Sequence, residues 1–242
     1  YEGYYIVTWP FNRVLRLRTT LLARNENYII TGPYERLLKA PNVMFNWGGA
    51  KIQLIYDDSR ELGLNLPQGN KFMIFGEYNQ KIDRSGNNLA VLGFDIRTYK
   101  RLHRSFIWAN RIAGSTNFGS DRLIYFMGGT DGWIAAKFDP TTRIDPDQKW
   151  TYQTLATNMR GFKQNARNGN NFIVLNSELR FPLFTYLLNR PINSDILKNF
   201  QLVGFGDLGT AWSGWNPYDE NNVLYTKYEY FGPLRTKVQY EK

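Results

Sequence analysis

Three ionisable residues, Arg160, Glu178 and Asp207, lie in segments whose other residues alternate between polar and apolar types. Arg160 belongs to the sequence Met-Arg-Gly-Phe, and the two carboxylates belong to strand-like stretches further along the chain. An ionised side chain facing a low-dielectric interior destabilises a fold unless it is paired. A guanidinium can bridge carboxylates through parallel hydrogen bonds. The trio therefore predicts an internal ionic contact that braces a loop, rather than an active site.

The two carboxylates are expected on the same face of strands that could be neighbours. Side chains alternate between two faces along a strand, so Glu178 shares a face with Val174, Asn176 and Arg180. By the same count, Asp207 shares a face with Phe205. If this polar face lines a watery lumen, both carboxylates point inward.

The loop that carries Arg160 would have to fold into this lumen. Gly161 permits a sharp backbone turn there, and Phe162 is expected to anchor the tip of the loop. The surrounding irregular region extends from about Gly128 to Asn170, and a loop of that length is normally functional or disordered. The pair Gly128-Gly129 predicts a bend or bulge, because no helix follows that could cradle a phosphate.

The rest of the chain also shows the two-residue period of β-strands. In Ala90–Tyr99, for example, Leu92 and Phe94 oppose Asp95 and Arg97. Such a polar face is tolerated in a watery lumen and not in a packed sandwich. Turn-forming clusters at 83–88 and 216–222 separate the strands. Strands are predicted at Leu15–Ala23, Lys51–Tyr56, Lys71–Gln80, Ala90–Tyr99, Phe106–Ala113, Phe172–Phe181, Gln201–Trp212, Tyr225–Tyr230 and Arg235–Glu241.

The composition favours one all-β domain at a membrane. Aromatic residues make up 16% of the 242-residue chain, yet the mean hydropathy is −0.47. This combination suits a transmembrane barrel with apolar lipid-facing residues, polar lumen residues and aromatic girdles. A water-soluble all-β protein with aromatic faces fits the composition nearly as well. The sequence contains no run of about 18 apolar residues, which excludes a transmembrane helix.

The charge and cysteine content narrow the choice of partners and sites. The net charge is +9, but the basic residues are scattered singly along strands and turns, which argues against a nucleic-acid partner. The absence of cysteine excludes disulfides and thiolate metal sites. Tyr1 opens directly into strand-like sequence without a signal peptide, so we expect a processed chain or a piece of a longer protein.

Five motifs follow one another along the chain. They are Tyr56-Asp57-Asp58-Ser59-Arg60 with Pro67-Gln68-Gly69 and Phe75-Gly76-Glu77-Tyr78, Met127-Gly128-Gly129-Thr130, Met159-Arg160-Gly161-Phe162, Ser177-Glu178-Leu179-Arg180-Phe181-Pro182, and Gly204-Phe205-Gly206-Asp207-Leu208-Gly209. In this order they resemble the BamA-type outer-membrane assembly superfamily, the bacterial surface antigen barrels, which includes two-partner-secretion transporters and patatin-fused barrels. The residues around the arginine loop look most like Bacteroidota-type members, some of which follow a periplasmic propeller.

The resemblance implies an antiparallel, sixteen-stranded transmembrane β-barrel. It also implies a lumen loop made by Arg160, Gly161 and Phe162, braced by Glu178 and Asp207 on the two following strands. Residues 1–242 are expected to form a partial barrel domain, without a periplasmic region and without the closing strands. Met159 departs from the β-branched residue usual at its position.

The function implied by the resemblance is insertion or translocation of proteins at the bacterial outer membrane. No cofactor, metal or enzymatic activity is expected. The expected partners are outer-membrane lipid, lipopolysaccharide, and client or partner outer-membrane proteins. Two alternatives stay open: a passive channel, or a barrel that anchors an attached domain or partner complex. A barrel-borne lipase is disfavoured, because no nucleophile and acid partner are recognisable near His103.

Two acidic pairs and several tryptophans admit more than one interpretation. The pairs Asp57-Asp58 and Asp145-Pro146-Asp147 offer oxygen ligands for a divalent cation, but their spacing favours solvated turns. Interfacial girdles and ordinary packing are both open for the tryptophans, which are Trp108, Trp133, Trp212 and Trp215.

Overall fold

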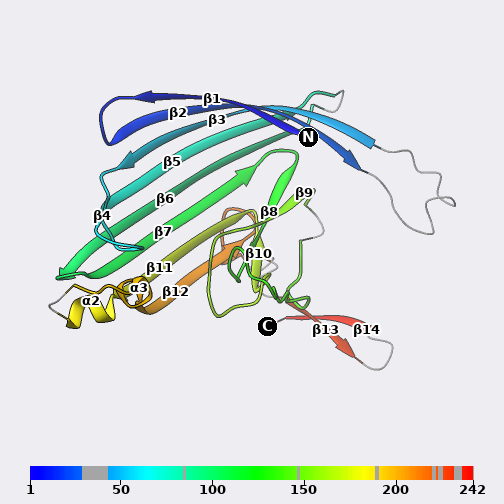
Figure 1. The fold of residues 1–242 in the computed structure, drawn as a ribbon. Helices are drawn as coiled ribbons and strands as arrows, with labels where there is room; N and C mark the ends of the chain where they lie inside the picture. The colour runs from blue at the N-terminus through cyan, green and yellow to red at the C-terminus, as the bar shows by residue number, and fades with distance from the viewer. Residues whose placement is uncertain are drawn as a thin grey trace.

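The computed structural model describes residues 1–28, 43–83, 86–145, 148–188, 191–219, 222, 226–231 and 236–241. Most of these residues form β-strands, as Figure 1 shows. The strands are β1 (Glu2–Pro10), β2 (Leu15–Tyr28), β3 (Val43–Asp57), β4 (Arg60–Glu61), β5 (Pro67–Lys81), β6 (Asn88–His103), β7 (Phe106–Phe118), β8 (Arg122–Met127), β9 (Trp150–Leu155), β10 (Arg167–Gly169), β11 (Asn171–Phe181), β12 (Leu202–Trp212), β13 (Thr226–Phe231) and β14 (Thr236–Glu241).

One large sheet follows the order β1-β2-β3-β5-β6-β7-β11-β12, and each neighbouring pair is antiparallel. The antiparallel all-β class is therefore confirmed. Along the described residues this sheet stays open, with β1 and β12 at its edges, so the expected closed, sixteen-stranded barrel is not seen in these strands. The short strand β4 pairs with β5, and a three-stranded sheet, β10-β8-β9, and a hairpin, β13-β14, complete the strand pairings of the described residues.

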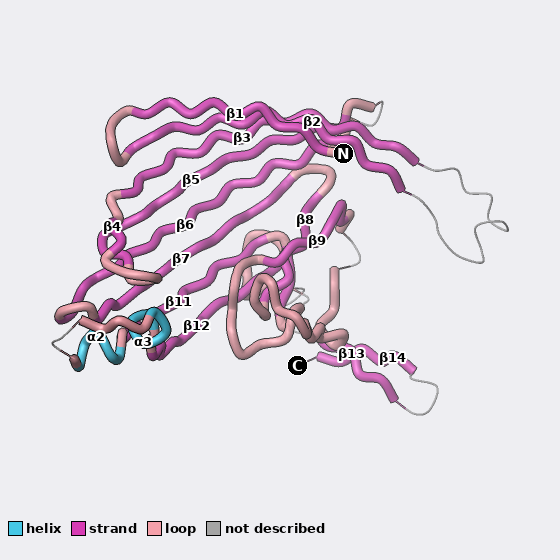
Figure 2. Tube along the Cα trace, viewed as in Figure 1, coloured by secondary structure: helices cyan, strands magenta, loops and turns pink. Residues whose placement is uncertain are grey.

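Two short helices interrupt the connection between β11 and β12. They are α2 (Leu183–Leu187) and α3 (Asp195–Asn199), which the strand pattern of the sequence does not predict. Figure 2 shows them together at one end of the sheet. We call this end the helix end, and the opposite end, where β7 and β11 meet their connecting segment, the loop end. Among the described residues, no helix has the length and apolar character needed to cross a membrane.

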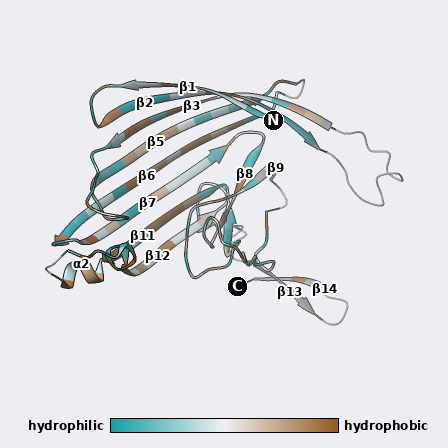
Figure 3. Ribbon diagram, viewed as in Figure 1, coloured by the Kyte–Doolittle hydropathy of each residue, from teal (hydrophilic) through white to brown (hydrophobic). Residues whose placement is uncertain are grey.

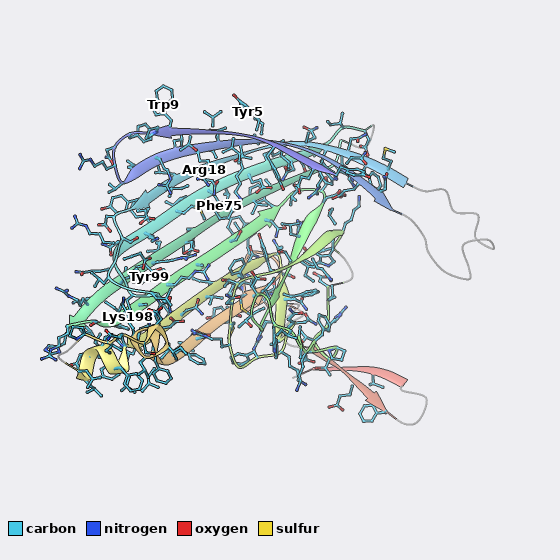
Figure 4. The ribbon with its side chains drawn as sticks, viewed as in Figure 1. Tyr5, Trp9, Arg18, Phe75, Tyr99 and Lys198 are labelled. Atoms are coloured by element: carbon cyan, nitrogen blue, oxygen red, sulfur yellow. The ribbon has the colours of Figure 1, made fainter. Side chains whose placement is uncertain are left out.

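Strand register sorts the side chains of the large sheet into two faces. Paired residues share a face, so Leu92 on β6 lies on the same side as Thr116 on β7. The outer face exposes apolar side chains, and Figure 3 shows hydropathy alternating along the strands. Figure 4 shows Tyr5 and Trp9 pointing away from the sheet. Exposed apolar residues of the outer face include Leu21, Ile52, Ile74, Leu92, Ile96, Leu175, Leu179 and Leu208.

The inner face carries the charged residues that the sequence placed together. Lys51 pairs with Glu77, Arg97 with Arg111, and Asn176 with Asp207 in the strand register. The predicted strand parity of Glu178 and Asp207 agrees with this register, because Asn176, two residues before Glu178, is the partner of Asp207.

The segment between β7 and β11 lies against the inner face of the curved sheet (Figure 1). The predicted irregular region is therefore partly wrong, since it contains β9 and β10. These short strands recruit β8 as their pairing partner. A buried apolar cluster joins this segment to the large sheet, which we call the wall. Burial of this cluster explains why the segment stays folded against the wall. The cluster comprises Trp47, Leu89, Val91, Phe172, Val174 and Ala211 from the wall, and Leu123, Tyr125, Met127 and Met159 from the segment.

The last two predicted strands and the two predicted turn clusters can also be compared with the structure. The predicted strands around Tyr225–Tyr230 and Arg235–Glu241 correspond to β13 and β14, although Tyr225 and Arg235 lie outside the described residues. The turn clusters lie between β5 and β6 and between β12 and β13, and residues 84–85 and 220–221 within them also lie outside the described part.

Candidate functional site

The backbone just before Arg160 is hydrogen-bonded to the residues that follow β8. The amide of Met159 donates a hydrogen bond of 2.8 Å to the carbonyl of Gly129. Gly128 and Gly129 both have positive φ, at 109° and 81°, so the predicted bend at this pair is confirmed. Met159 is 6% exposed and belongs to the buried cluster. The residue before the arginine therefore anchors the loop.

Arg160 binds Asp207 through its backbone and its side chain. The backbone amide and Nε both donate to Oδ2 of Asp207 at 2.8 Å, and Nη2 donates to Oδ1 at 2.7 Å. The side chain of Asp207 is only 1% exposed. Asn176 completes the carboxylate's partners, with Nδ2 donating to Oδ1 at 2.9 Å. A buried carboxylate with this many donors is fully compensated.

Glu178 accepts a hydrogen bond from the remaining guanidinium nitrogen of Arg160. Nη1 donates to Oε1 at 2.6 Å, so Arg160 joins two neighbouring strands of the wall, β11 and β12. The other oxygen, Oε2, accepts from Nε of Arg180 at 2.8 Å and pairs with its Nη2 at 2.7 Å. The guanidinium carbon of Arg160 also lies 3.9 Å from the ring centroid of Phe205, within cation–π range.

The charge of Arg160 is stabilised by these contacts. The hydrogen bonds to Asp207 raise the pKa of Arg160; burial opposes this effect, and the hydrogen bond to Glu178 adds to it. All three guanidinium nitrogens are engaged. A permanently charged and saturated guanidinium suits positioning, because it has no proton to transfer near neutral pH.

The structure brings Arg160, Glu178 and Asp207 together, whereas Gly161 and Phe162 lie beside the contact. Gly161 has a φ of 84°, which agrees with the predicted sharp turn. Phe162 is 46% exposed, so the expectation that it anchors the loop tip is wrong. The buried anchor is Met159 instead, because the loop turns at Gly161 and leaves the following ring at the surface of the segment.

A second set of contacts fixes the residues just before Arg160. Arg111 on β7 donates from Nη1 to the hydroxyl of Thr157 at 2.6 Å. Its Nε and Nη2 bind Asp95 at 3.1 and 2.7 Å, and Arg97 binds the same carboxylate. Three basic residues in adjacent register would repel one another. They are Lys71, Arg97 and Arg111. Asp95 offsets this repulsion between its two arginines.

The sequence pattern placed Arg180 on the face of Glu178, but Arg180 was not among the residues predicted for the site. The signal was available, since Arg180 stands two residues after Glu178 and therefore on the same face. A cavity of about 190 Å³ lies between these groups, lined by Arg97, Tyr99, Ala109, Asn110, Arg111, Thr130, Asn158, Arg160, Asn176, Glu178 and Arg180.

Another buried ion cluster lies at the loop end. Asp121, in the turn after β7, is 1% exposed and binds Nζ of Lys81 at 2.7 Å and Nζ of Lys149 at 2.9 Å. Burial raises the pKa of the Asp121 carboxyl, but the hydrogen bonds and charges of the two lysines outweigh burial and hold it below its usual value. Lys81 also stacks over Phe45 and Trp47, at 4.3 and 4.9 Å from the ring centroids.

The acidic pair Asp57-Asp58 has structural partners. Asp57 accepts from Ser59 and pairs with Lys71, and Asp58 accepts from the Asn70 amide, so this pair closes a turn. Within the described residues, no group of three acidic, histidine or cysteine side chains could hold a metal ion. Asp147 lies outside those residues.

His103 and Trp108 bind neighbouring polar groups. Nδ1 of His103 lies 2.7 Å from the hydroxyl of Tyr186 at the helix end. Trp108 is 41% exposed on the outer face, and its ring N–H donates to Ser177 at 3.0 Å. This position fits the girdle interpretation for Trp108.

No family model matches this chain, and no curated protein matches it.

Proposed function

We propose that this chain is the barrel portion of a BamA-type outer-membrane protein that acts in insertion or translocation of proteins at the bacterial outer membrane. One observation carries the proposal: a loop arginine, Arg160, bridges acidic residues on the two strands that follow in the wall, Glu178 on β11 and Asp207 on β12. This is the brace that the sequence motifs led us to expect.

The two faces of the sheet support a membrane setting. Apart from the edge strand β1, the strands of the wall are 11–16 residues long, and a tilted strand needs roughly 9–11 residues to cross a bilayer. Exposed apolar side chains on the outer face suit contact with lipid, whereas the charged inner face suits a watery lumen. Outer-membrane lipid and lipopolysaccharide are the surroundings that we propose.

A closed wall of sixteen strands belongs to the same proposal. The edges β1 and β12 carry backbone N–H and C=O groups that, in lipid, have to be satisfied by further strands. The mechanism that we infer needs no cofactor and no bond chemistry. The barrel offers its seam or lumen to client strands, and the Arg160 loop keeps the wall from deforming while they pass.

Depletion of the full-length protein in its native host tests this function. Quantitative proteomics of the outer membrane should show lower levels of other barrels or surface proteins. Re-expression of the wild-type protein should restore them, and Arg160→Ala should restore them less well. Unchanged levels after depletion would contradict the proposal. Ion conductance by the purified protein without any client defect would indicate a passive channel instead.

A further inference from the structure

The turn between β3 and β5, residues 58–66, leaves the wall and crosses the inner face at the helix end. We call these residues the flap. Inside it, β4 pairs with Pro67 and Gln68, the first two residues of β5. The change of direction occurs at Gly69, where φ is 122° and a Cβ atom would lie 2.7 Å from the Asp58 carboxylate. Only glycine fits this bend.

The tip of the flap reaches the far side of the sheet. Arg180 on β11 donates from Nη1 to both the carbonyl and the side-chain oxygen of Asn65, each at 3.0 Å. Gln201, just before β12, donates from Nε2 to the carbonyl of Leu64 at 2.5 Å. The strands β6 and β7 lie between β5 and β11, so the flap spans three strand spacings, roughly 14 Å. Figure 1 shows it pointing from β5 toward β11.

The flap has few other attachments. Its hairpin closes on itself through hydrogen bonds of 3.0 Å, from the Leu62 amide to the Leu66 carbonyl and from the Leu66 amide to the Gly63 carbonyl. Leu66 is 6% exposed, but Leu64 is 65% exposed. Segments with little buried area and exposed hydrogen bonds open before the core does. The two hydrogen bonds to Asn65 and the one to Leu64 therefore decide whether the tip of the flap stays bound to the far side of the sheet.

Arg180 belongs to the flap contact and to the Arg160 brace at the same time. Oε1 of Glu178 accepts from Arg160, and Oε2 accepts from Arg180. One carboxylate thus connects the lumen loop, which enters from the loop end, with the flap, which covers the helix end. The contacts run without a gap from Asp207 through Arg160, Glu178 and Arg180 to Asn65.

We propose that the flap is a gate over the helix end of the lumen, held closed by Arg180, and that Glu178 couples this gate to the lumen loop. The gate rests on the proposed barrel, since only a closed wall has a lumen to close. The two states are a flap bonded to Arg180 and a flap released from it. A client or loop movement that withdraws Glu178 from Arg180 weakens the orientation of that guanidinium and favours release.

Hydrogen exchange and conductance of the full-length protein test the gate. In Arg180→Gln, amides of residues 62–66 should exchange roughly tenfold faster, because a charge-assisted bond is lost, and conductance in planar bilayers should rise. Arg104→Gln is the matched control. It removes the same charge at the same end, where Arg104 donates to the Tyr186 carbonyl and has no bond to the flap. Wild-type exchange and conductance in Arg180→Gln would overturn the gate.

Two further variants separate the gate from misfolding and test the coupling. Asn65→Gly keeps the positive φ of 58° at the tip and removes only the side-chain acceptor, so it should raise exchange less than Arg180→Gln. Glu178→Gln should speed exchange in both the flap and the lumen loop, and an effect confined to the loop would overturn the coupling. None of these results depends on client levels after depletion, so a failed gate is distinguishable from a failed assembly function.

Discussion

Arg160 donates three hydrogen bonds to Asp207, one from its backbone amide and two from its guanidinium. The carboxylate therefore fixes the position of the loop backbone as well as that of the arginine side chain. The Asp207 side chain is 1% exposed, so its carboxylate depends on Arg160 and Asn176 for hydrogen bonds. These hydrogen bonds hold the loop at one defined position on the wall.

Removing the guanidinium should strongly destabilise the wall. Arg160→Ala leaves Asp207 buried without a cation, and we expect a loss of about 3 kcal/mol in the free energy of unfolding. Urea unfolding of the full-length protein in detergent measures this value. Lys100→Ala, at an exposed position of β6, serves as the control and should change stability by less than about 0.5 kcal/mol.

Exchanging the charges should restore only part of this loss. Arg160→Asp combined with Asp207→Arg re-forms an ion pair but not the bond from the backbone amide to the carboxylate. We expect a recovery of about 1 kcal/mol relative to the sum of the single changes, measured as a double-mutant cycle. A coupling energy of zero would show that the two side chains are not in contact.

The Asp121 cluster should make part of the stability depend on pH. The pKa of Asp121 is lower in the fold than its ordinary value of 3.8. Its contribution is thus fully present above that ordinary value and is lost as the pH falls through the lowered value. Asp121→Asn should cost about 2 kcal/mol near neutral pH. The difference from wild type in urea unfolding should shrink on acidification, and a difference independent of pH would contradict the role of the charge.

Two glycines with positive φ should respond differently to alanine. A Cβ atom on Gly128 would lie 2.0 Å from the carbonyl oxygen of Lys163, whereas nothing lies within 4 Å of one on Gly161. Gly161→Ala should therefore cost only the backbone strain, about 1 kcal/mol. Gly128→Ala should cost clearly more, about 3 kcal/mol, because the backbone must also shift. Equal unfolding midpoints for the two variants would show that close packing at Gly128 does not limit stability.

An arginine on the outer face distinguishes lipid from water. Ile96 is 40% exposed near the middle of β6. If this face contacts the hydrocarbon core, Ile96→Arg should destabilise the protein in lipid bilayers by about 2–4 kcal/mol. In water the same change at an exposed site should be nearly neutral. The yield of folding into phospholipid vesicles, compared with that of the wild type, measures this effect. An unchanged yield would argue against lipid contact.

The two-residue period of the sequence predicted most strands of the large sheet and their faces, but it did not predict β4, β8, β9 and β10. Side-chain alternation is a local property of extended backbone, so counting places Glu178 and Asp207 on one face without any knowledge of the neighbours. The same counting holds for Leu92 and Asp95 on β6. Local sequence did not predict α2 and α3, in which no residue is buried and which are only five residues long each, too short for a clear periodic signal.

Contacts between distant segments were beyond the sequence pattern. Arg180 lies on the predicted face, but its bond to Asn65 joins residues 115 positions apart and depends on the bend at Gly69. Met159 rather than Phe162 anchors the loop because Met159 is buried in the apolar cluster that includes Val174 and Ala211 of the wall. The alternation along the chain determined which way each side chain points. The tertiary structure alone decided which groups meet, because strand order and loop path depend on packing across the whole sheet.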